Sequence, residues 1–402
     1  MSLSRTLDIP CSTPTVAGKI LLSRLSRLYQ GSLRLITPDG SEHCFGTKVE
    51  APDAELHVHD WAACSKLLLA GDIGFAEAYR DGLLDSPDLV ALLRLALHNQ
   101  TVLGSAASGS LPARAWYWLK HKLHRNSKAG SKRNIHAHYD LGNDFYQLWL
   151  DPTWTYSSAW FDGYYDLPLS VAQAAKYQRI CDVLGLKPGM RVLEIGCGWG
   201  GFAEHAVQQG ISVHGVTISN AQLEFAQRRL ANKPLARLEW SDYRDLHGKY
   251  DAIVSIEMFE AVGEAYWQAY FSKVRSLLKP GAKALVQSIT IDESRFDQYR
   301  TGSDFIQTFI FPGGMLPSRS EFQRQASKAG LDTHDRLDFG HDYAETLRRW
   351  RHDFEYKLDA VHKLGFDDAF IRIWRLYLCY CEAGFDEDRI GVSQFVLQEA
   401  RP

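Results

Sequence analysis

Beyond about residue 171, the chain alternates between short apolar runs and longer amphipathic stretches. The apolar runs have the length of buried strands, and the stretches between them have the spacing of helices with one apolar face. This pattern predicts helices at 171–184, 202–209, 220–231 and 266–278, and strands at 191–195, 212–217, 236–240, 251–256 and 283–291. Helices that alternate with strands favour an α/β fold in which a parallel sheet carries helices on both faces.

The chain before this alternation predicts a smaller α+β unit, because its strands and helices do not alternate in the same way. We expect strands at 32–36 and 55–58 and helices at 61–70, 74–81 and 88–97. Residues 1–18 show no regular pattern, and no catalytic constellation is visible up to residue 103. The sequence therefore predicts an accessory domain at 1–103.

A linker and a basic segment follow at 104–133. Residues 104–110 are rich in Gly and Ser, which is typical of a flexible connection. From Leu89 to Tyr139 the chain has no acidic residue, and Trp116, Tyr117 and Trp118 stand among lysines and arginines. Basic residues beside interfacial aromatics are suited to an anionic lipid surface. A solvated charged helix between domains is the alternative, and a nucleic-acid arm is disfavoured because the rest of the chain is acidic.

The main domain is then predicted at 134–402. After residue 291 the alternation gives way to an insertion that contains Phe305, Phe309, Phe311 and a Pro-Gly-Gly turn. Two amphipathic helices, at 343–364 and 367–383, and a last strand at 391–397 close the chain.

The composition of the chain says more about where the protein works in the cell than about any reaction it catalyses. The net charge is −3, which implies no overall attraction to nucleic acid. Seven scattered cysteines without a Cys-x-x-Cys pair suit a reducing cytoplasm and predict neither disulfides nor a zinc site. No apolar run approaches the roughly 18 to 20 residues of a membrane span. We therefore expect a cytoplasmic protein.

Candidate chemistry is concentrated at residues 190–201, Met-Arg-Val-Leu-Glu-Ile-Gly-Cys-Gly-Trp-Gly-Gly. Gly196, Gly198 and Gly200 follow a predicted strand and let the backbone approach a ligand closely. Glu194 stands where that strand ends and can meet a cation or a hydroxyl. An NAD site would show an acid after the second strand, but that strand ends at Thr217 without one. This difference favours S-adenosylmethionine over NAD.

Four blocks then make the chain resemble the cyclopropane-fatty-acyl-phospholipid synthase and mycolic acid cyclopropane synthase family. They are residues 138–159, the glycine stretch with 215–222, MFEAVG at 258–263 and FIFPGG at 309–314 with Leu-Pro-Ser at 316–318. FGHDY at 339–343 extends the match, which covers about residue 134 to the end. The resemblance implies a Rossmann-like class I methyltransferase sheet, with the N-terminal α+β domain as an addition.

The resemblance also implies which residues hold S-adenosylmethionine. Tyr156 and Ser157 would touch the cofactor, the glycine loop would hold its methionine part, and Tyr243 would lie beside the adenine. The ribose would be reached by Thr217, Ile218 and Gln222. A hydroxyl and an amide can bond ribose hydroxyls much as an acid does, which would explain the missing carboxylate.

The implied reaction is methyl transfer to a cis double bond of a phospholipid acyl chain, followed by closure of a cyclopropane. A base must remove a proton from the new methyl group in a dry pocket. The resemblance implies bound bicarbonate as that base, cradled by Glu260, Tyr343 and the backbone of Ile289. A buried glutamate that bonds an anion must keep or share a proton, so we expect a raised pKa for Glu260.

Two departures from the family pattern bear on ring closure. Ser158 stands where the family has a cysteine, and Gln287 stands where it has a histidine. Both still form hydrogen bonds, but Gln287 cannot carry a proton, which leaves a methyl-branched or methylene product as an alternative. Cys381 matches a family cysteine and is the weakest assignment, since an apolar helix surrounds it. His136 and His138 lack a partner cluster, so no metal is predicted.

Together with the basic aromatic segment, the resemblance implies a cytoplasmic methyltransferase at the inner membrane surface. Its partners would be unsaturated phospholipid acyl chains and the bilayer surface, without nucleic acid, and a homodimer is left open. A lipid-binding or cofactor-binding protein without turnover is the alternative from another class, although the intact Glu260 and glycine loop count against it.

Overall fold

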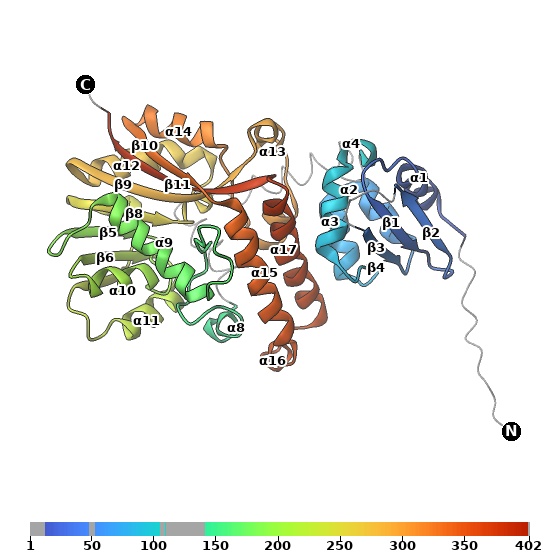
Figure 1. Ribbon diagram of the computed structural model, residues 1–402, viewed down its shortest axis with the longest axis horizontal. Coiled ribbons are helices and arrows are strands. Elements are labelled where there is room, and N and C mark those ends of the chain that lie inside the picture. The colour runs from blue at the N-terminus through green and yellow to red at the C-terminus, as the bar shows by residue number, and fades with distance from the viewer. Residues whose placement is uncertain (1–12, 48–52, 105–108, 110–140, 401–402) are drawn as a thin grey trace. The chain divides into compact units, whose positions relative to one another are not determined.

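The computed structural model describes residues 13–47, 53–104, 109 and 141–400 (Figure 1). The chain divides into two compact units, Met1–Tyr117 with Asp367–Ala383, and Trp118–Phe366 with Gly384–Pro402. The basic segment at 114–133, most of the linker, His136 and His138 lie outside the described residues. The lipid-surface interpretation of that segment therefore stays a prediction.

The N-terminal unit is built on a four-stranded sheet in the order β2-β1-β3-β4. Its strands are β1 (Ser32–Ile36), β2 (Glu42–Gly46), β3 (Asp53–Val58) and β4 (Leu84–Asp85). Its helices are α1 (Val16–Leu25), α2 (Ala62–Arg80), α3 (Leu89–His98) and α4 (Gln100–Leu103). Gly71 interrupts α2 with a φ of 60°, which separates the two helices that the sequence predicts there. The helix α1 and the strands β2 and β4 were not predicted.

Most of the long helix α17 (Asp368–Asp386) also belongs to this unit. The guanidinium of Arg372 lies 4.0 Å from the ring centroid of Tyr79 and pairs with the Asp85 carboxylate at 3.0 Å. The hydroxyl of Tyr380 donates to Asp72 at 3.1 Å. A segment near the end of the chain thus completes a unit formed mainly by its beginning.

The second unit is built on a seven-stranded sheet in the order β10-β11-β9-β8-β5-β6-β7. Five strands are parallel: β5 (Arg191–Ile195), β6 (Ser212–Thr217), β7 (Ala236–Trp240), β8 (Tyr250–Ile256) and β9 (Leu278–Ile291). The strand β11 (Ile390–Glu399) runs antiparallel to β9 and to β10 (Leu331–Asp338). The predicted fold class is confirmed, with a mixed sheet in place of an all-parallel one.

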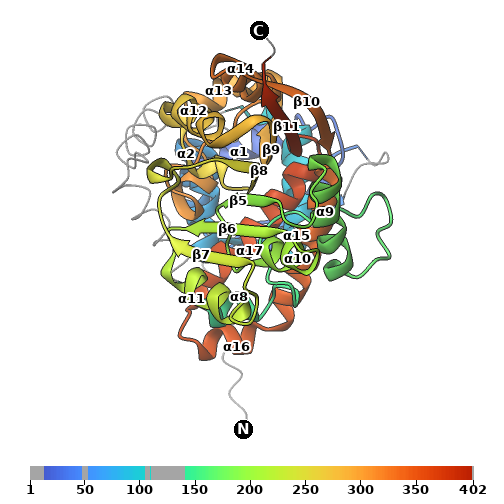
Figure 2. The same ribbon diagram turned by 90° about the vertical axis from the view of Figure 1, so that its left-hand side faces the viewer.

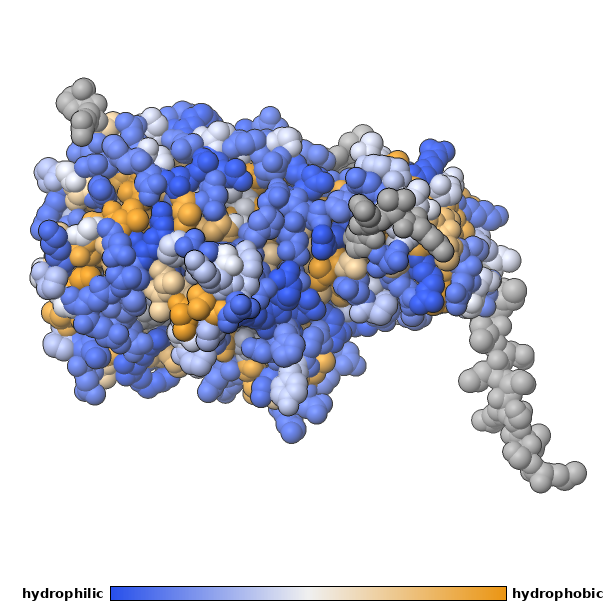
Figure 3. Space-filling view, in the orientation of Figure 1, coloured by the Kyte–Doolittle hydropathy of each residue, from blue (hydrophilic) through white to orange (hydrophobic). Residues whose placement is uncertain are grey.

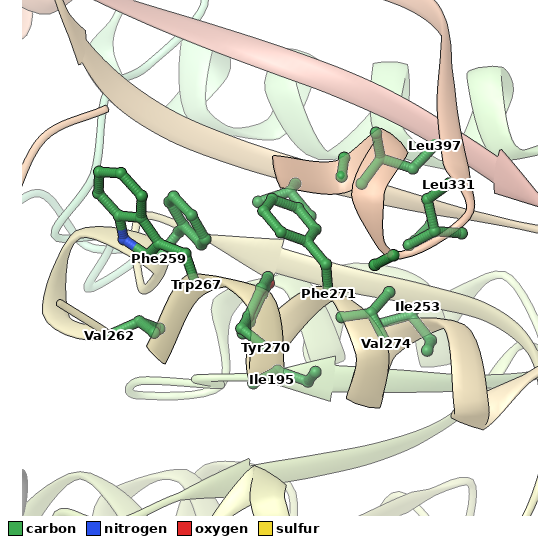
Figure 4. Close-up of a cluster of buried hydrophobic side chains, with 14 of the residues drawn as sticks. Ile195, Ile253, Phe259, Val262, Trp267, Tyr270, Phe271, Val274, Leu331 and Leu397 are labelled. Atoms are coloured by element: carbon green, nitrogen blue, oxygen red, sulfur yellow. The ribbon is translucent and has the colours of Figure 1, made fainter. Parts of the chain in front are cut away.

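Helices cover both faces of this sheet, as Figure 2 shows. One face packs on α9 (Leu169–Leu184) and α10 (Gly201–Gln208), and the other on α12 (Trp267–Leu277) and α14 (Arg319–Lys328). Large aromatic side chains of α12 fill the space against the sheet (Figure 4). Burying this apolar surface is the main stabilising contribution to the unit.

The remaining elements of this unit lie outside the sheet. The helices are α8 (Asn143–Gln147), α11 (Asn220–Arg229), α13 (Phe296–Arg300), α15 (Gly340–Tyr356) and α16 (Leu358–Lys363). Short 3-10 turns occur at Tyr243–Asp245, Phe259–Ala261, Glu264–Tyr266 and Glu293–Arg295, and the phenylalanine-rich insertion contains a π-helix at Ile306–Ile310.

Polar side chains dominate the face shown in Figure 3, where hydrophobic residues form separate patches. Among the described residues, no helix combines the length and the apolar character that a membrane crossing requires.

Candidate active site

Four segments with candidate chemistry meet at one edge of the large sheet. The glycine loop follows β5, Thr217 is the last residue of β6, and Glu257 directly follows β8. The register pairs Ile256, at the end of β8, with Gln287 of β9. Because the carboxyl ends of parallel strands share one edge, the topology brings these side chains toward one another, as is usual for ligand sites in such sheets.

The glycine loop leaves room for a ligand at Gly198. Its φ is 50°, and a Cβ atom added there would meet no protein atom within 4 Å. At Gly196, with a φ of 83°, an added Cβ would lie 2.8 Å from the Cγ of Met258, so this glycine is required by packing. Gly200, with a φ of 84°, begins the turn into α10. The open side of Gly198 is where a ligand can approach the backbone.

Glu194 supplies the polar group of this loop. Its side chain is buried, and its Oε2 atom has no hydrogen-bond partner among the described residues. Burial raises the pKa of Glu194 well above its ordinary value. A buried acceptor without a partner is costly unless a ligand satisfies it. The amino or hydroxyl groups of S-adenosylmethionine would do so, and the loop therefore fits that molecule.

The residues predicted for the ribose and adenine lie at the next two strand ends. The hydroxyl of Thr217 donates to Gln222 at 3.2 Å, and the carbonyl of Ile218 accepts from Trp240 at 3.1 Å. Tyr243 follows β7 and packs edge-on against Tyr270, with ring centroids 5.4 Å apart. Burial raises the pKa of Tyr243 to about 12, so its hydroxyl stays protonated at neutral pH.

Tyr156 and Ser157 lie between an aromatic cluster and a buried lysine. The ring of Tyr156 is 5.3 Å from Trp350 and 5.4 Å from Tyr146 between centroids. The Nζ atom of Lys176, from α9, donates to the Ser157 hydroxyl at 2.7 Å and to the carbonyl of Ser158 at 2.8 Å. Burial lowers the pKa of Lys176 to about 7, although nearby carboxylates oppose that shift. Sequence reasoning missed Lys176, because a lysine in an amphipathic helix resembles a surface residue.

Sequence reasoning also missed Glu257, at the centre of the predicted catalytic residues. Its Oε1 accepts from the Ser158 backbone N–H at 2.9 Å and from the Gln287 amide at 2.7 Å. Its Oε2 accepts from the Tyr343 hydroxyl at 2.7 Å. Burial raises the pKa of Glu257, whereas Lys176 and these hydrogen bonds lower it. The structure thus brings together Ser158, Gln287 and Tyr343, which are far apart in the sequence, around one carboxylate.

Gln287 belongs to a longer chain of hydrogen bonds. Its Oε1 accepts from Gln394 at 3.0 Å, and the Oε1 of Gln394 accepts from the guanidinium of Arg179. Arg179 in turn pairs with Asp335 at 3.2 Å. The chain leads from Glu257 to the exposed carboxylate of Asp335.

Glu260 lies in the 3-10 turn after Glu257. Its Oε1 accepts from the backbone N–H of Ile289, and its Oε2 is buried without a partner among the described residues. Burial, and then the charge of Glu257, raise the pKa of Glu260 to about 8. This direction agrees with the expectation from the sequence. Glu260 is therefore a neutral acid at pH 7, beside a second carboxylate.

Two predicted residues contribute differently from what the sequence suggests. The hydroxyl of Ser158 donates to the neighbouring carbonyl of Ala159 at 2.8 Å, so only its backbone reaches Glu257. Cys381 lies in α17, within the stretch that groups with the N-terminal sheet. Among residues 13–47, 53–104 and 141–400, no group of three or more His, Cys, Asp or Glu residues could hold a metal ion.

The sheet with its glycine loop and buried acid defines a class I S-adenosylmethionine-dependent methyltransferase. The family model described as mycolic acid cyclopropane synthetase matches residues 126–395, and the chain belongs to this family.

Relatives and solved structures agree with this assignment. The chain is 35% identical to the tuberculostearic acid methyltransferase UfaA1 of Mycobacterium tuberculosis, over 98% of this chain and 93% of that protein. It is also 35% identical to the cyclopropane-fatty-acyl-phospholipid synthase of Escherichia coli K12, over 85% of this chain and 87% of that protein. The crystal structure of the mycolic acid cyclopropane synthase CmaA1 with SAH and CTAB is 33% identical, with a TM-score of 0.62, over 67% of this chain and 98% of that one.

Proposed function

We propose that this protein transfers a methyl group from S-adenosylmethionine to a cis double bond in the acyl chain of a phospholipid. The observation that carries the proposal is the acid pair Glu257 and Glu260, which follows β8 directly beside the glycine loop. The loop fits the methyl donor, and the acid pair offers one group that holds a proton and one that accepts hydrogen bonds. The family and the names of its relatives support an unsaturated acyl chain as the acceptor.

When bound, S-adenosylmethionine supplies an electrophilic methyl group on a sulfonium. The residues of the chain have to position the alkene, exclude water and accept a proton. Tyr156 sits among Tyr146, Trp149 and Trp350, which form an apolar wall next to the predicted cofactor position. Such a wall excludes water, which would otherwise quench a cation on the acyl chain.

The proposed product is a cyclopropane. The second candidate is a methylene product, or a methyl-branched chain that keeps a double bond. The name of one relative, a tuberculostearic acid methyltransferase, supports the second candidate. Gln287 donates to Glu257 as a neutral amide and does not separate the two, because ring closure and methylene formation each release one proton from the new methyl group. The two relatives at 35% identity carry names of both kinds, so likeness alone does not separate the two products.

The residues present do not fit the bicarbonate that the sequence predicts as base. Tyr343 and Gln287, two of its expected donors, donate to Glu257 at 2.7 Å, and the N–H of Ile289 donates to Glu260. A bound anion would have to displace these carboxylates from their donors. No step of the proposed function is therefore assigned to bicarbonate.

The proposal includes contact with a bilayer surface, because the acyl chains of phospholipids lie within bilayers. The segment at 114–133, outside the described residues, carries the basic and aromatic side chains suited to that contact. The cytoplasmic location, at the inner membrane surface, and a homodimer stay predictions from the sequence.

The test is to incubate the protein with S-adenosylmethionine and vesicles of phospholipids that carry one cis double bond per chain. Mass spectrometry of the released fatty acids should show the addition of CH2. Ring closure and methylene formation give the same mass, so proton NMR of the product has to separate them. An unchanged mass with every lipid tested would contradict the proposed enzyme and leave a binding protein.

A further inference from the structure

We propose that the carboxylate of Glu257 is the base of the reaction. This side chain takes the place of the bound bicarbonate that the sequence predicts. This inference rests on the proposed function, because it names the proton acceptor for that reaction.

The first support is the set of donors around Glu257. Its two oxygens accept hydrogen bonds from the Tyr343 hydroxyl, the Gln287 amide and the backbone N–H of Ser158, at 2.7 to 2.9 Å. These donors come from three separate segments, and they match the needs of a carboxylate, which only accepts hydrogen bonds. The same atoms would cradle a small anion, so Glu257 occupies an anion site that the protein itself has built.

The second support is the backbone of Glu257. Its φ is 48°, in the left-handed region that residues with a side chain rarely adopt. Such conformations persist where the surroundings hold them, and they cluster at functional sites. Here the left-handed turn, together with the hydrogen bond from Glu257 N–H to the Gln287 carbonyl at 2.9 Å, directs the side chain among its donors.

The third support is the charge balance of the acid pair. Lys176 and the three donors favour the ionised form of Glu257. The charge of Glu257 in turn helps to keep Glu260 protonated. Burial moves the pKa of Glu257 upward, toward neutral pH, where a carboxylate is a stronger base than in water. Taken as a whole, the residue is intermediate in exposure.

The proposed step conserves atoms and electrons. The alkene electron pair forms the new carbon–carbon bond, the bonding pair of the donor stays on sulfur, and the other alkene carbon becomes a cation. The carboxylate of Glu257 then takes a proton from the new methyl group. The electrons of that C–H bond close the ring, or, after a hydride shift to the neighbouring carbon, form a methylene double bond. The proton passes from Glu257 to solvent after the product leaves.

The decisive experiment compares Glu257→Gln with Glu257→Gly, with formate and bicarbonate as added anions. The glutamine fills the same space without basicity, whereas the glycine empties the donor cradle and adopts a φ of 48° without strain. We expect each variant to lose at least about a hundredfold in kcat. We expect added formate or bicarbonate to restore part of the rate of Glu257→Gly and none of the rate of Glu257→Gln. The wild-type rate should not change when dissolved carbonate is removed.

Two further measurements do not depend on turnover. Calorimetric titration with S-adenosylhomocysteine should give wild-type affinity for both variants, which shows that they fold. A 13C NMR titration should show labelled formate bound by Glu257→Gly and not by the wild type. The proposal is overturned if the wild-type rate needs bicarbonate, if Glu257→Gln stays active, or if the folded glycine variant binds no formate. If the wild type turns over no lipid, the proposed function fails, and the formate titration still reports on the cradle.

Discussion

Arg179 fixes the direction in which the Gln287 amide points, and it does so through the amide of Gln394. A guanidinium only donates hydrogen bonds, so the oxygen of Gln394 must face Arg179 and its NH2 group must face the oxygen of Gln287. The NH2 group of Gln287 is then left to face Glu257. The positive charge of Arg179 thereby ensures that Gln287 presents its NH2 group, a donor, to the carboxylate of Glu257.

The first prediction follows from this relay, the chain of hydrogen bonds from Arg179 through Gln394 and Gln287 to Glu257. In Arg179→Met both amides can turn, and Gln287 then presents its oxygen to Glu257 for part of the time. The lost donor raises the pKa of Glu257, so a smaller fraction is ionised at a given pH. On the acid limb of the pH profile we expect kcat to fall about three- to tenfold, in line with about 1 kcal/mol for one hydrogen bond. We also expect the acid limb of the kcat profile to move to higher pH, with KM unchanged.

The control for this relay is Asp335→Asn. It removes the exposed partner of Arg179 but leaves the guanidinium in place, and exposed ion pairs contribute little. A pH profile that is the same in Arg179→Met as in the wild type would contradict the relay.

The second prediction concerns stability and Glu260. Its pKa is raised to about 8, whereas in the unfolded chain it is about 4.3. Between these values the unfolded state has released a proton that the folded state keeps, so stability falls as pH rises. Glu260→Gln removes this dependence. The difference in free energy of unfolding between Glu260→Gln and the wild type should therefore grow in favour of the variant from about pH 5 to pH 8, by a few kcal/mol at most.

Urea unfolding at both pH values measures this difference. Glu224→Gln, at an exposed position on α11, is the matched control and should follow the wild type at both pH values. If Glu260→Gln also follows the wild type, Glu260 is not the buried neutral acid described above.

The third prediction separates the ligand role of Gly198 from its backbone role. Gly198→Ala places a methyl group in open space at a φ of 50°, so strain should cost about 1–2 kcal/mol without a clash. Gly185→Ala meets the same conditions at the end of α9, with a φ of 63° and no atom within 4 Å. We expect similar losses of stability in both. Only Gly198→Ala should lose S-adenosylhomocysteine affinity, by at least about tenfold, as measured by calorimetry. Equal affinities in the two variants would argue against the loop as the cofactor site.

The fourth prediction concerns the buried amine of Lys176. Lys176→Met leaves two acceptors, the Ser157 hydroxyl and the Ser158 carbonyl, without this donor, which costs about 1–3 kcal/mol. It also removes a positive charge that favours the ionised form of Glu257. We expect a lower melting temperature together with an acid limb of kcat at higher pH. A lower melting temperature with an unchanged pH profile would leave Lys176 a purely structural role.

The parts of the fold that follow local patterns could be predicted from the sequence. The glycine loop and the parallel strands each consist of consecutive residues, and the spacing of apolar residues and glycines among them indicates burial and backbone geometry directly. The strand β10 escaped prediction because most of its side chains are polar and exposed, so no apolar alternation marks it. The grouping of α17 with the N-terminal sheet depends on contacts such as that of Arg372 with Tyr79. These two residues are far apart in the sequence, so local patterns could not predict the contact.

The site divides in the same way. Glu260 was predicted because it lies in a recognisable block, and its raised pKa followed from burial next to a charge. Glu257 was missed although it directly precedes the block at 258–263, because nothing in the local sequence marks it as the acceptor of hydrogen bonds from distant segments. Its importance arises only when Ser158, Gln287 and Tyr343 converge on it, at separations of 99, 30 and 86 residues along the chain.

The left-handed turn at Glu257 has an evolutionary consequence. Glycine accepts that backbone without strain, and some glycine and glutamate codons differ by a single nucleotide. One point mutation at this position would therefore exchange a base carried by the protein for a vacant cradle open to a dissolved anion. Because the surrounding donors come from other segments of the chain, this exchange requires no change in any of them.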